Sequence, residues 1–336
     1  MTRLRTLIQT AAMVSLALSP EAVRAQTYLV ENITSSSIGT VAAATTGTTV
    51  FRNASGAISV VSGNGAVVGG SATAQLVSIR CFDQILFLQF CGDSSNKARI
   101  RVGRTGTPTG RAHNLAEIGV YSGTGTIGSG TNETTGTVDV TLAGWTGGNQ
   151  LRTFWIYYNF PISGDDTGGL TGLATSFFYV YATANPSVPT SGQIGSVTAT
   201  VKKSLSIGKV SDLRFGSMFK PSSGSYVATI SGVTGALSAS PTSAAGNLLT
   251  SATGAATYTI AGEPNATFSL SYPSTMTMTA GGSSLTATLS SATTTGTKTM
   301  PVTGTMPLVI GGSITVGSAQ AYGAYSGSFS VTVAYN

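Results

Sequence analysis

Apolar and polar residues alternate along much of the chain, one position in two. Clear runs lie at residues 98–102, 137–142, 153–160, 176–181 and 197–201, and weaker ones follow at 226–230, 256–260 and 329–335. Successive side chains of a strand point to opposite faces, so this period predicts strands with one face in a core. Glycine-rich clusters such as Gly164–Gly169 separate the runs and predict turns. We find no helical 3.6-residue stripe after residue 25, and we expect an all-β fold.

The pattern changes character near Lys202. Beyond Lys220 only Glu263 and Lys298 carry a formal charge, although the alternation continues. Because a domain usually holds about 100–200 residues, we expect two tandem antiparallel β-sandwich domains, over residues 71–202 and 203–336. Residues 202–204 would be the hinge between them.

Residues 26–70 are small and polar, with short alternating pieces such as 57–60. We expect a partly flexible leader that contains a first strand, because short terminal segments are weakly held. The alternative is a strand donated to another copy, since an extended segment can complete a neighbour's sheet. Tyr28, Val30 and Ile33 are weak candidates for the apolar residues of such a strand.

The first 25 residues have the three parts of a secretory signal peptide. Arg3 and Arg5 are basic, 7–18 is apolar, and 23–25 is a small-x-small cleavage site. A membrane anchor is the alternative, but about 12 apolar residues fall short of the roughly 20 that span a bilayer. We therefore expect export to the periplasm and cell surface, and no transmembrane helix.

Composition agrees with an extracellular β protein. The chain has 43 glycines and only 8% charged residues, against about 25% in ordinary soluble domains. Removing residues 1–25 takes the 17 basic and 11 acidic residues to 14 and 10, a formal charge of +4. Such a mild charge does not indicate a nucleic-acid partner.

Nine residues separate the two cysteines, Cys81 and Cys91. An even number of cysteines in an exported chain favours a disulfide. A metal site would need more ligands than these two thiols and the single histidine, His113. We expect no metal and no cofactor.

The C-terminus carries the most specific pattern. Gly323 is the fourteenth residue from the end, and apolar residues follow in a strand that stops at the terminus: Tyr325, Phe329, Val331, Val333 and Tyr335. This pattern resembles the C-terminal signature of subunits assembled by the chaperone–usher pathway. Residues 204–336, from Ser204–Ile207 to Gly323–Val333, also resemble a family of uncharacterised, secreted, pilin-like β domains of Gram-negative bacteria.

The resemblance implies Ig-like or pilin-like sandwiches and an assembly strand over Gly323–Tyr335. It implies a periplasmic chaperone, an usher or like subunits as partners, and a place in a fimbrium. A final strand can also be an open edge that pairs with another chain, or an ordinary strand paired within its own sheet. The chain departs from the family in lacking a cysteine in residues 204–336.

Catalytic chemistry has little support. A Ser-His-Asp site needs a histidine held by a carboxylate and touching a nucleophile, and His113 has no such signature around it. A basic cluster without intervening acids is a candidate patch for an anionic ligand such as a surface glycan, and it consists of Lys97, Arg99, Arg101, Arg104 and Arg111. The alternative for these residues is a solvated outer face.

We therefore expect an exported, non-catalytic surface protein, structural or adhesive, similar to a fimbrial subunit or tip adhesin. The second hypothesis is a monomeric secreted carbohydrate-binding or matrix protein. The receptor, the chaperone and the oligomeric state are not fixed by the sequence.

Overall fold

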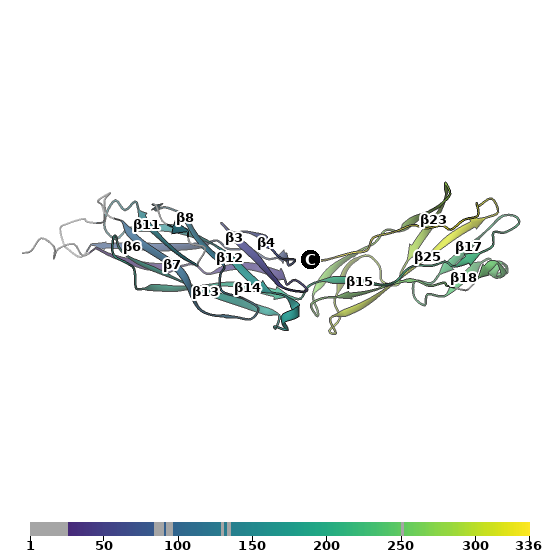
Figure 1. The fold of residues 1–336 in the computed structure, drawn as a ribbon, viewed down its shortest axis with the longest axis horizontal. Helices are drawn as coiled ribbons and strands as arrows, with labels where there is room; N and C mark the ends of the chain where they lie inside the picture. Colours follow the sequence, from purple (N-terminus) through teal and green to yellow (C-terminus); the bar gives the residue numbers. More distant parts are fainter. Residues whose placement is uncertain (1–25, 84–90, 92–96, 129–130, 133–135, 250–251) are drawn as a thin grey trace, which may run out of the picture.

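The computed structural model describes residues 26–83, 91, 97–128, 131–132, 136–249 and 252–336. Their regular structure is almost entirely β, in sheets that are mostly antiparallel, which confirms the predicted fold class. The strands gather in two bodies that lie end to end along one long axis (Figure 1). Within the described residues, no helix has the length and apolar character needed to cross a membrane.

The N-terminal body contains the strands up to Lys202 and one short 3-10 helix. They are β1 (Gln26–Ile33), β2 (Ser36–Ala42), β3 (Thr48–Ala54), β4 (Ala57–Ser62), β5 (Ala66–Gly69), β6 (Gln75–Asp83), β7 (Ala98–Thr109), β8 (Glu117–Ser122), β9 (Thr126–Ile127), β10 (Thr131–Asn132), β11 (Thr137–Ala143), β12 (Leu151–Ser163), η2 (Asp165–Thr167), β13 (Gly172–Ala184) and β14 (Gly192–Lys202).

Two sheets enclose the core of this body. One has the order β1-β6-β12-β3-β4, with β8 also on β12; the other has the order β10-β11-β7-β13-β14-β2-β5, with β9 also on β11. The alternating runs place one residue in two inside, as in β7, where Ile100 and Val102 are buried and Arg99 and Arg101 face outward. Aromatic side chains from facing strands fill the space between the sheets, among them Phe51, Phe154, Phe160 and Phe178.

Residues 26–69 are part of this sandwich, which corrects the expectation of a partly flexible leader. Strand β1 pairs with β6 over its length, and β2 pairs in parallel with β14 and antiparallel with β5. Tyr28, Val30 and Ile38 are buried in the core. The short, polar pieces concealed this role because their partners lie far along the chain: Ser36 is opposite Val197.

The C-terminal body holds a second, separate core, and the chain reaches it through residues 203–205. Its elements are β15 (Ser206–Ser211), β16 (Ser217–Met218), β17 (Ser225–Ile230), β18 (Leu237–Ser240), η3 (Thr242–Asn247), β19 (Leu248–Leu249), β20 (Ala256–Ala261), β21 (Thr267–Ser271), β22 (Thr275–Ala280), β23 (Ser283–Ser290), β24 (Gly296–Thr299), β25 (Thr305–Gly317) and β26 (Thr332–Tyr335).

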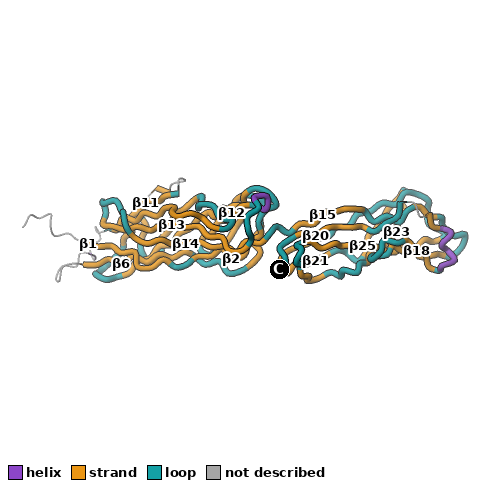
Figure 2. Tube along the Cα trace, turned by 90° about the horizontal axis from the view of Figure 1, so that it is seen from below, coloured by secondary structure: helices purple, strands orange, loops and turns teal. Residues whose placement is uncertain are grey.

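Strand β25 organises this body. The main sheet has the order β15-β20-β25-β17-β18, and β23 pairs with β25 and with β22; a separate sheet has the order β24-β21-β26. The chain returns at its end to the junction between the bodies, where the C-terminus lies (Figures 1 and 2). Strands β1 and β6 are labelled at the opposite pole of the N-terminal body (Figure 2).

Candidate functional site: an open groove in the C-terminal body

The first and last strands of the C-terminal body each end a sheet. Strand β15 pairs only with β20, and β26 pairs only with β21, among the described strands. The two strands lie close together without sharing a ladder. Each therefore presents a row of backbone N–H and C=O groups that a further strand can bind.

The predicted assembly strand is regular only in its last part. Strand β26 covers residues 332–335, whereas residues 323–331 form a single bridge, between Ser326 and Thr279 of β22. Among the predicted residues, Tyr325, Phe329, Val331, Val333 and Tyr335 are half-buried and pack against the core from one side. Leu205, Ile207 and Leu213 do the same near the first strand. The segments at both free edges thus carry apolar side chains that are incompletely covered.

A cavity of about 580 Å³ lies between the segments that continue these two edges along the chain, and we refer to the two edges and this cavity together as the groove. One wall is the segment 213–220 and the other is the segment 320–325, which includes Gly323. Met278, Ile314 and Val316 contribute apolar side chains to its lining. Tyr322, which lines the cavity, has 82% of its surface exposed. A cavity with several apolar lining residues, next to segments that continue two free strand edges, has the chemistry to take a strand.

At the junction, the last strand is tied to the linker between the bodies. The Tyr335 hydroxyl accepts a hydrogen bond from the Glu263 backbone N–H (2.6 Å) and donates one to the Lys203 carbonyl (3.0 Å). The Lys202 ammonium lies 5.2 Å from the centre of the Tyr335 ring, within cation–π range. Burial raises the pKa of this phenol, so it stays protonated and can donate.

Two carboxylates complete this junction. The Glu263 side chain accepts hydrogen bonds from the Lys203 N–H (2.9 Å) and from the Thr171 hydroxyl (2.9 Å) of the N-terminal body. Asp165 accepts hydrogen bonds from the backbone N–H and hydroxyl of Ser204, at 2.9 and 2.6 Å. The joint is therefore held by bonds from both bodies and from the C-terminal strand.

Arg111 belongs to the junction and not to an exposed patch. It is 4% exposed and forms an ion pair of 2.5 Å with Asp165, while its guanidinium also donates to the Gly169 carbonyl. Burial raises the pKa of Asp165, but the hydrogen bonds from Ser204 and the Arg111 ion pair outweigh it and hold the pKa below its usual value.

The other predicted patch residues lie apart from Arg111. Arg99 and Arg101 share Asp139 on the outer face of the sheet, with Nη2–Oδ2 distances of 3.6 and 2.6 Å, and the hydrogen bond from Arg101 lowers the pKa of that carboxyl. Lys97 is exposed just before β7. Arg104 donates to the Ala116 carbonyl. The structure thus brings only part of the predicted cluster together.

His113 lacks the surroundings of a catalytic histidine. Its Nε2 lies 2.6 Å from the Ser163 hydroxyl, and no hydrogen bond among the described residues joins its ring to a carboxylate. The residues that the structure describes contain no group of three side chains suited to a metal ion. Among the described residues, the hydrogen bonds of His113 supply a hydroxyl but no orienting acid.

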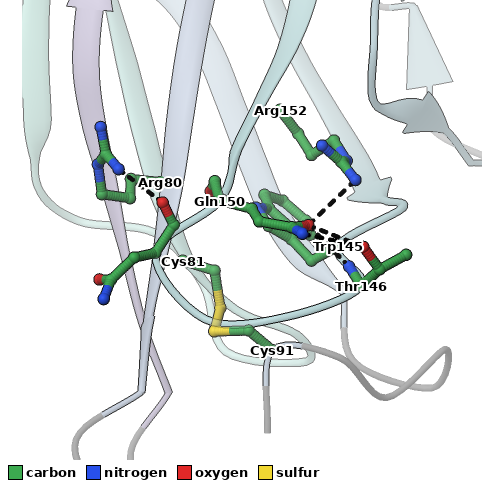
Figure 3. Close-up of a disulfide and its surroundings, with 8 residues drawn as sticks. Arg80, Cys81, Cys91, Trp145, Thr146, Gln150 and Arg152 are labelled. Atoms are coloured by element: carbon green, nitrogen blue, oxygen red, sulfur yellow. Dashed lines mark hydrogen bonds between the residues drawn. A yellow bond between two sulfur atoms is a disulfide. The ribbon is translucent and has the colours of Figure 1, made fainter. Parts of the chain in front are cut away.

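The disulfide between Cys81 and Cys91 is formed, as predicted, at the pole of the N-terminal body (Figure 3). Trp145 lies near it and donates its indole N–H to the Gln150 carbonyl (3.0 Å). The Gln150 side chain in turn accepts hydrogen bonds from the Thr146 N–H and the Arg152 guanidinium. This end of the body is thus fixed by a covalent link and a compact polar network.

Several residues of the groove and junction escaped the sequence reasoning, namely Arg214, Lys220, Glu263 and Tyr322. Charged residues are rare in this part of the sequence, so each of them could have been singled out as a candidate: Lys220 is the last basic residue before Lys298, and Glu263 is the only acid after Asp212.

The match to a family model covers the C-terminal body. The model of a family described as a domain of unknown function (DUF4402) matches residues 205–335. Among curated proteins, none matches the chain.

Two solved structures are similar over much of the chain. One is the CsuC–CsuE chaperone–tip adhesion subunit complex from the archaic chaperone-usher Csu pili of Acinetobacter baumannii: 11% identity, 78% of this chain, 91% of that chain and a TM-score of 0.27. The other is a chaperone–tip adhesin complex of CFA/I fimbriae biogenesis: 8% identity, 77% and 90% coverage and a TM-score of 0.25. These likenesses are too low to carry an argument about function.

Proposed function

We propose that this protein is an exported, non-catalytic surface subunit whose C-terminal body is completed by a β-strand from a partner chain. The observation that carries the proposal is the pair of unpaired edges, of β15 and β26, together with the cavity between the segments that continue them. An inserted strand would satisfy both rows of backbone groups and cover the half-buried apolar residues. In this proposal the two bodies are two domains, divided after residue 202.

In this proposal the groove receives a strand. The first strand of this chain, β1, is not available to be donated to the groove of another copy. Tyr28 and Val30 are 5% and 1% exposed, and β1 is paired with β6. Donating β1 would remove these side chains from the core, at a cost of about 1.5–3 kcal/mol for each large apolar residue exposed. We therefore favour a subunit at the end of an assembly, as a tip adhesin is, with a chaperone or another subunit as the occupant.

The first test is periplasmic expression of residues 26–336, followed by size-exclusion chromatography with light scattering. We expect the protein to copurify with a periplasmic chaperone. If it is instead purified as a monomer, a synthetic peptide of alternating Val and Thr is added to it. That peptide should then bind and raise the melting temperature of the C-terminal body. A stable monomer that neither binds such peptides nor gains stability from them would refute the acceptor role.

A substitution tests the role of the last strand. We expect Val331→Asp with Val333→Asp to abolish surface display without preventing export, because two carboxylates would be placed among half-buried apolar groups. Circular dichroism of the purified variant separates loss of docking from loss of folding. Normal display of a folded variant would contradict the proposal.

One observation favours the second candidate, a carbohydrate-binding protein. On the outer face of β13, the rings of Tyr179 and Tyr181 stack with centroids 4.3 Å apart, and Tyr181 is opposite Arg101. Aromatic rings beside a guanidinium suit stacking and hydrogen bonding to a sugar. The wild type would then bind to a glycan array, and Tyr181→Ala would abolish that binding. Together with a failure of strand peptides to bind the protein, this result would support the second candidate.

A further inference from the structure

The far end of the groove is basic. From residue 204 onward the chain has four basic residues, and two of them, Arg214 and Lys220, line the cavity at this end. The residues that line it include no acid. In a segment so poor in charge, two cations at one end of an apolar groove give that end a distinct electrostatic character.

Nearby acids leave a positive balance. Asp212 is shared between Lys209, at 2.8 Å, and Arg214, at 3.6 Å. No ion pair among the described residues includes Lys220. The three cations and one carboxylate around this end thus sum to a charge of about +2, which favours an anionic group in an occupant.

Lys220 also spans the groove. It extends from the wall formed by 213–220, and its ammonium lies 4.5 Å from the ring centre of Tyr322, on the opposite wall. A strand that occupies the cavity would therefore lie close to this cation. The lining also includes apolar side chains such as Met278 and Ile314, which can pack against the apolar residues of the same strand.

We propose that this end of the groove selects a partner strand that carries an acidic side chain next to its apolar, alternating residues. The carboxylate would bind Arg214 and Lys220, and would fix how far the strand enters. This inference rests on the proposed acceptor function. The occupant is a strand of a different protein, because β1 of this chain is held in its own core.

The test uses residues 26–336 and acetylated, amidated peptides with one alternating Val/Thr sequence. Two Glu, Gln or Lys residues are placed at one end or at the other, and binding is measured by fluorescence anisotropy. We expect Glu at one of the two ends to tighten binding about five- to tenfold over Gln at the same end, and Lys to weaken it. The advantage should shrink as the salt concentration rises.

Matched variants locate the effect. Arg214→Gln with Lys220→Gln should remove the preference for Glu while Gln peptides still bind. Lys298→Gln, which removes one positive charge from β24 outside the cavity, should keep the preference, and each single variant of Arg214 or Lys220 should weaken it.

The possible results separate the two proposals. Equal binding of Glu, Gln and Lys peptides, or equal gain from Glu at either end, would overturn charge selection and leave the acceptor function intact. Failure of all peptides to bind the folded protein would overturn the acceptor function itself.

Discussion

A small polar network lies inside the N-terminal core, around the hydroxyl of Tyr158. This hydroxyl bonds to the Ser36 hydroxyl and accepts a hydrogen bond from the Asn53 side chain (3.0 Å), and all three residues are at most 2% exposed. Burial raises the pKa of Tyr158 to about 12, against the opposing effect of these hydrogen bonds. The network links β2, β3 and β12, so it helps to hold the segment 26–69 in place.

Tyr158→Phe should destabilise the N-terminal body by about 1–3 kcal/mol, because Ser36 and Asn53 would each lose a buried partner. Both tryptophans, Trp145 and Trp155, lie in this body, so fluorescence during denaturant unfolding reports on it alone. Tyr181→Phe, on the outer face, is the control and should change the unfolding free energy little. Equal stability of the two variants would contradict the assigned role of the network.

Asp165 gives the junction a pH dependence. The pKa of Asp165 is lower in the folded state than in the unfolded state. Its contribution to stability is therefore fully present above the pKa of the unfolded state, about 3.9, and is lost as the pH falls through the pKa of the folded state. We expect acid to loosen the bonds to Arg111 and Ser204. Asp165→Asn should reduce the loss of stability on acidification, measured by thermal unfolding at several pH values below 5. An unchanged acid profile would show that other carboxylates dominate.

At the scale of elements, the disulfide secures the end of β6. It joins residues ten positions apart, and closing a loop of that size stabilises a fold by about 2–4 kcal/mol in the chain-entropy account. Replacing both Cys81 and Cys91 by Ser should lower the stability of the N-terminal body by this amount. Tryptophan fluorescence measures it, and the C-terminal body, followed by proteolysis at sites beyond residue 203, should be unaffected. Reductant should destabilise the wild type and leave the double variant unchanged.

Strand positions were largely predictable because the information is local. The alternating runs at 98–102, 137–142 and 176–181 fall in β7, β11 and β13, where inward residues are buried. Residues 26–69 were not predictable in the same way. Their small side chains give a weak period, and β2 is fixed by pairing with β14, more than 150 residues away.

The sequence predicted one side of the candidate site, the last strand, but not the other. The C-terminal alternation identified β26 and its apolar residues, but nothing in the sequence placed the edge of β15 across from them. Arg111 was grouped with Lys97 and Arg99 by spacing alone, whereas Asp165, 54 residues further on, holds it at the junction. A local sequence pattern does not show which distant residue a charged side chain will pair with in the fold.

At the scale of the molecule, the junction couples the C-terminal strand to the arrangement of the two bodies. The Tyr335 hydroxyl joins Glu263 of one body to the linker carbonyl of Lys203. Tyr335→Phe removes both hydrogen bonds and keeps the ring under Lys202.

This variant should let the bodies move relative to each other, because the linker loses its tie to the last strand. Small-angle X-ray scattering should show a broader distribution of maximum dimensions than for wild type. Tyr258→Phe, on β20, is the control and should scatter as wild type does. Identical curves for Tyr335→Phe and wild type would mean that Asp165 and Glu263 suffice to fix the joint.

The way the chain leaves the N-terminal body has a mechanical consequence. Strand β14 ends at Lys202 and lies between β13 and β2 along the long axis (Figure 2). If one body is anchored and the other is pulled, tension enters β14 along its own direction. Its hydrogen bonds to the antiparallel β13 lie across that direction and those to the parallel β2 are slanted to it, so both ladders bear the load in shear and do not peel open one by one. If a partner strand binds the groove as we propose, this arrangement would let the protein carry tension between that strand and a ligand bound by the N-terminal body.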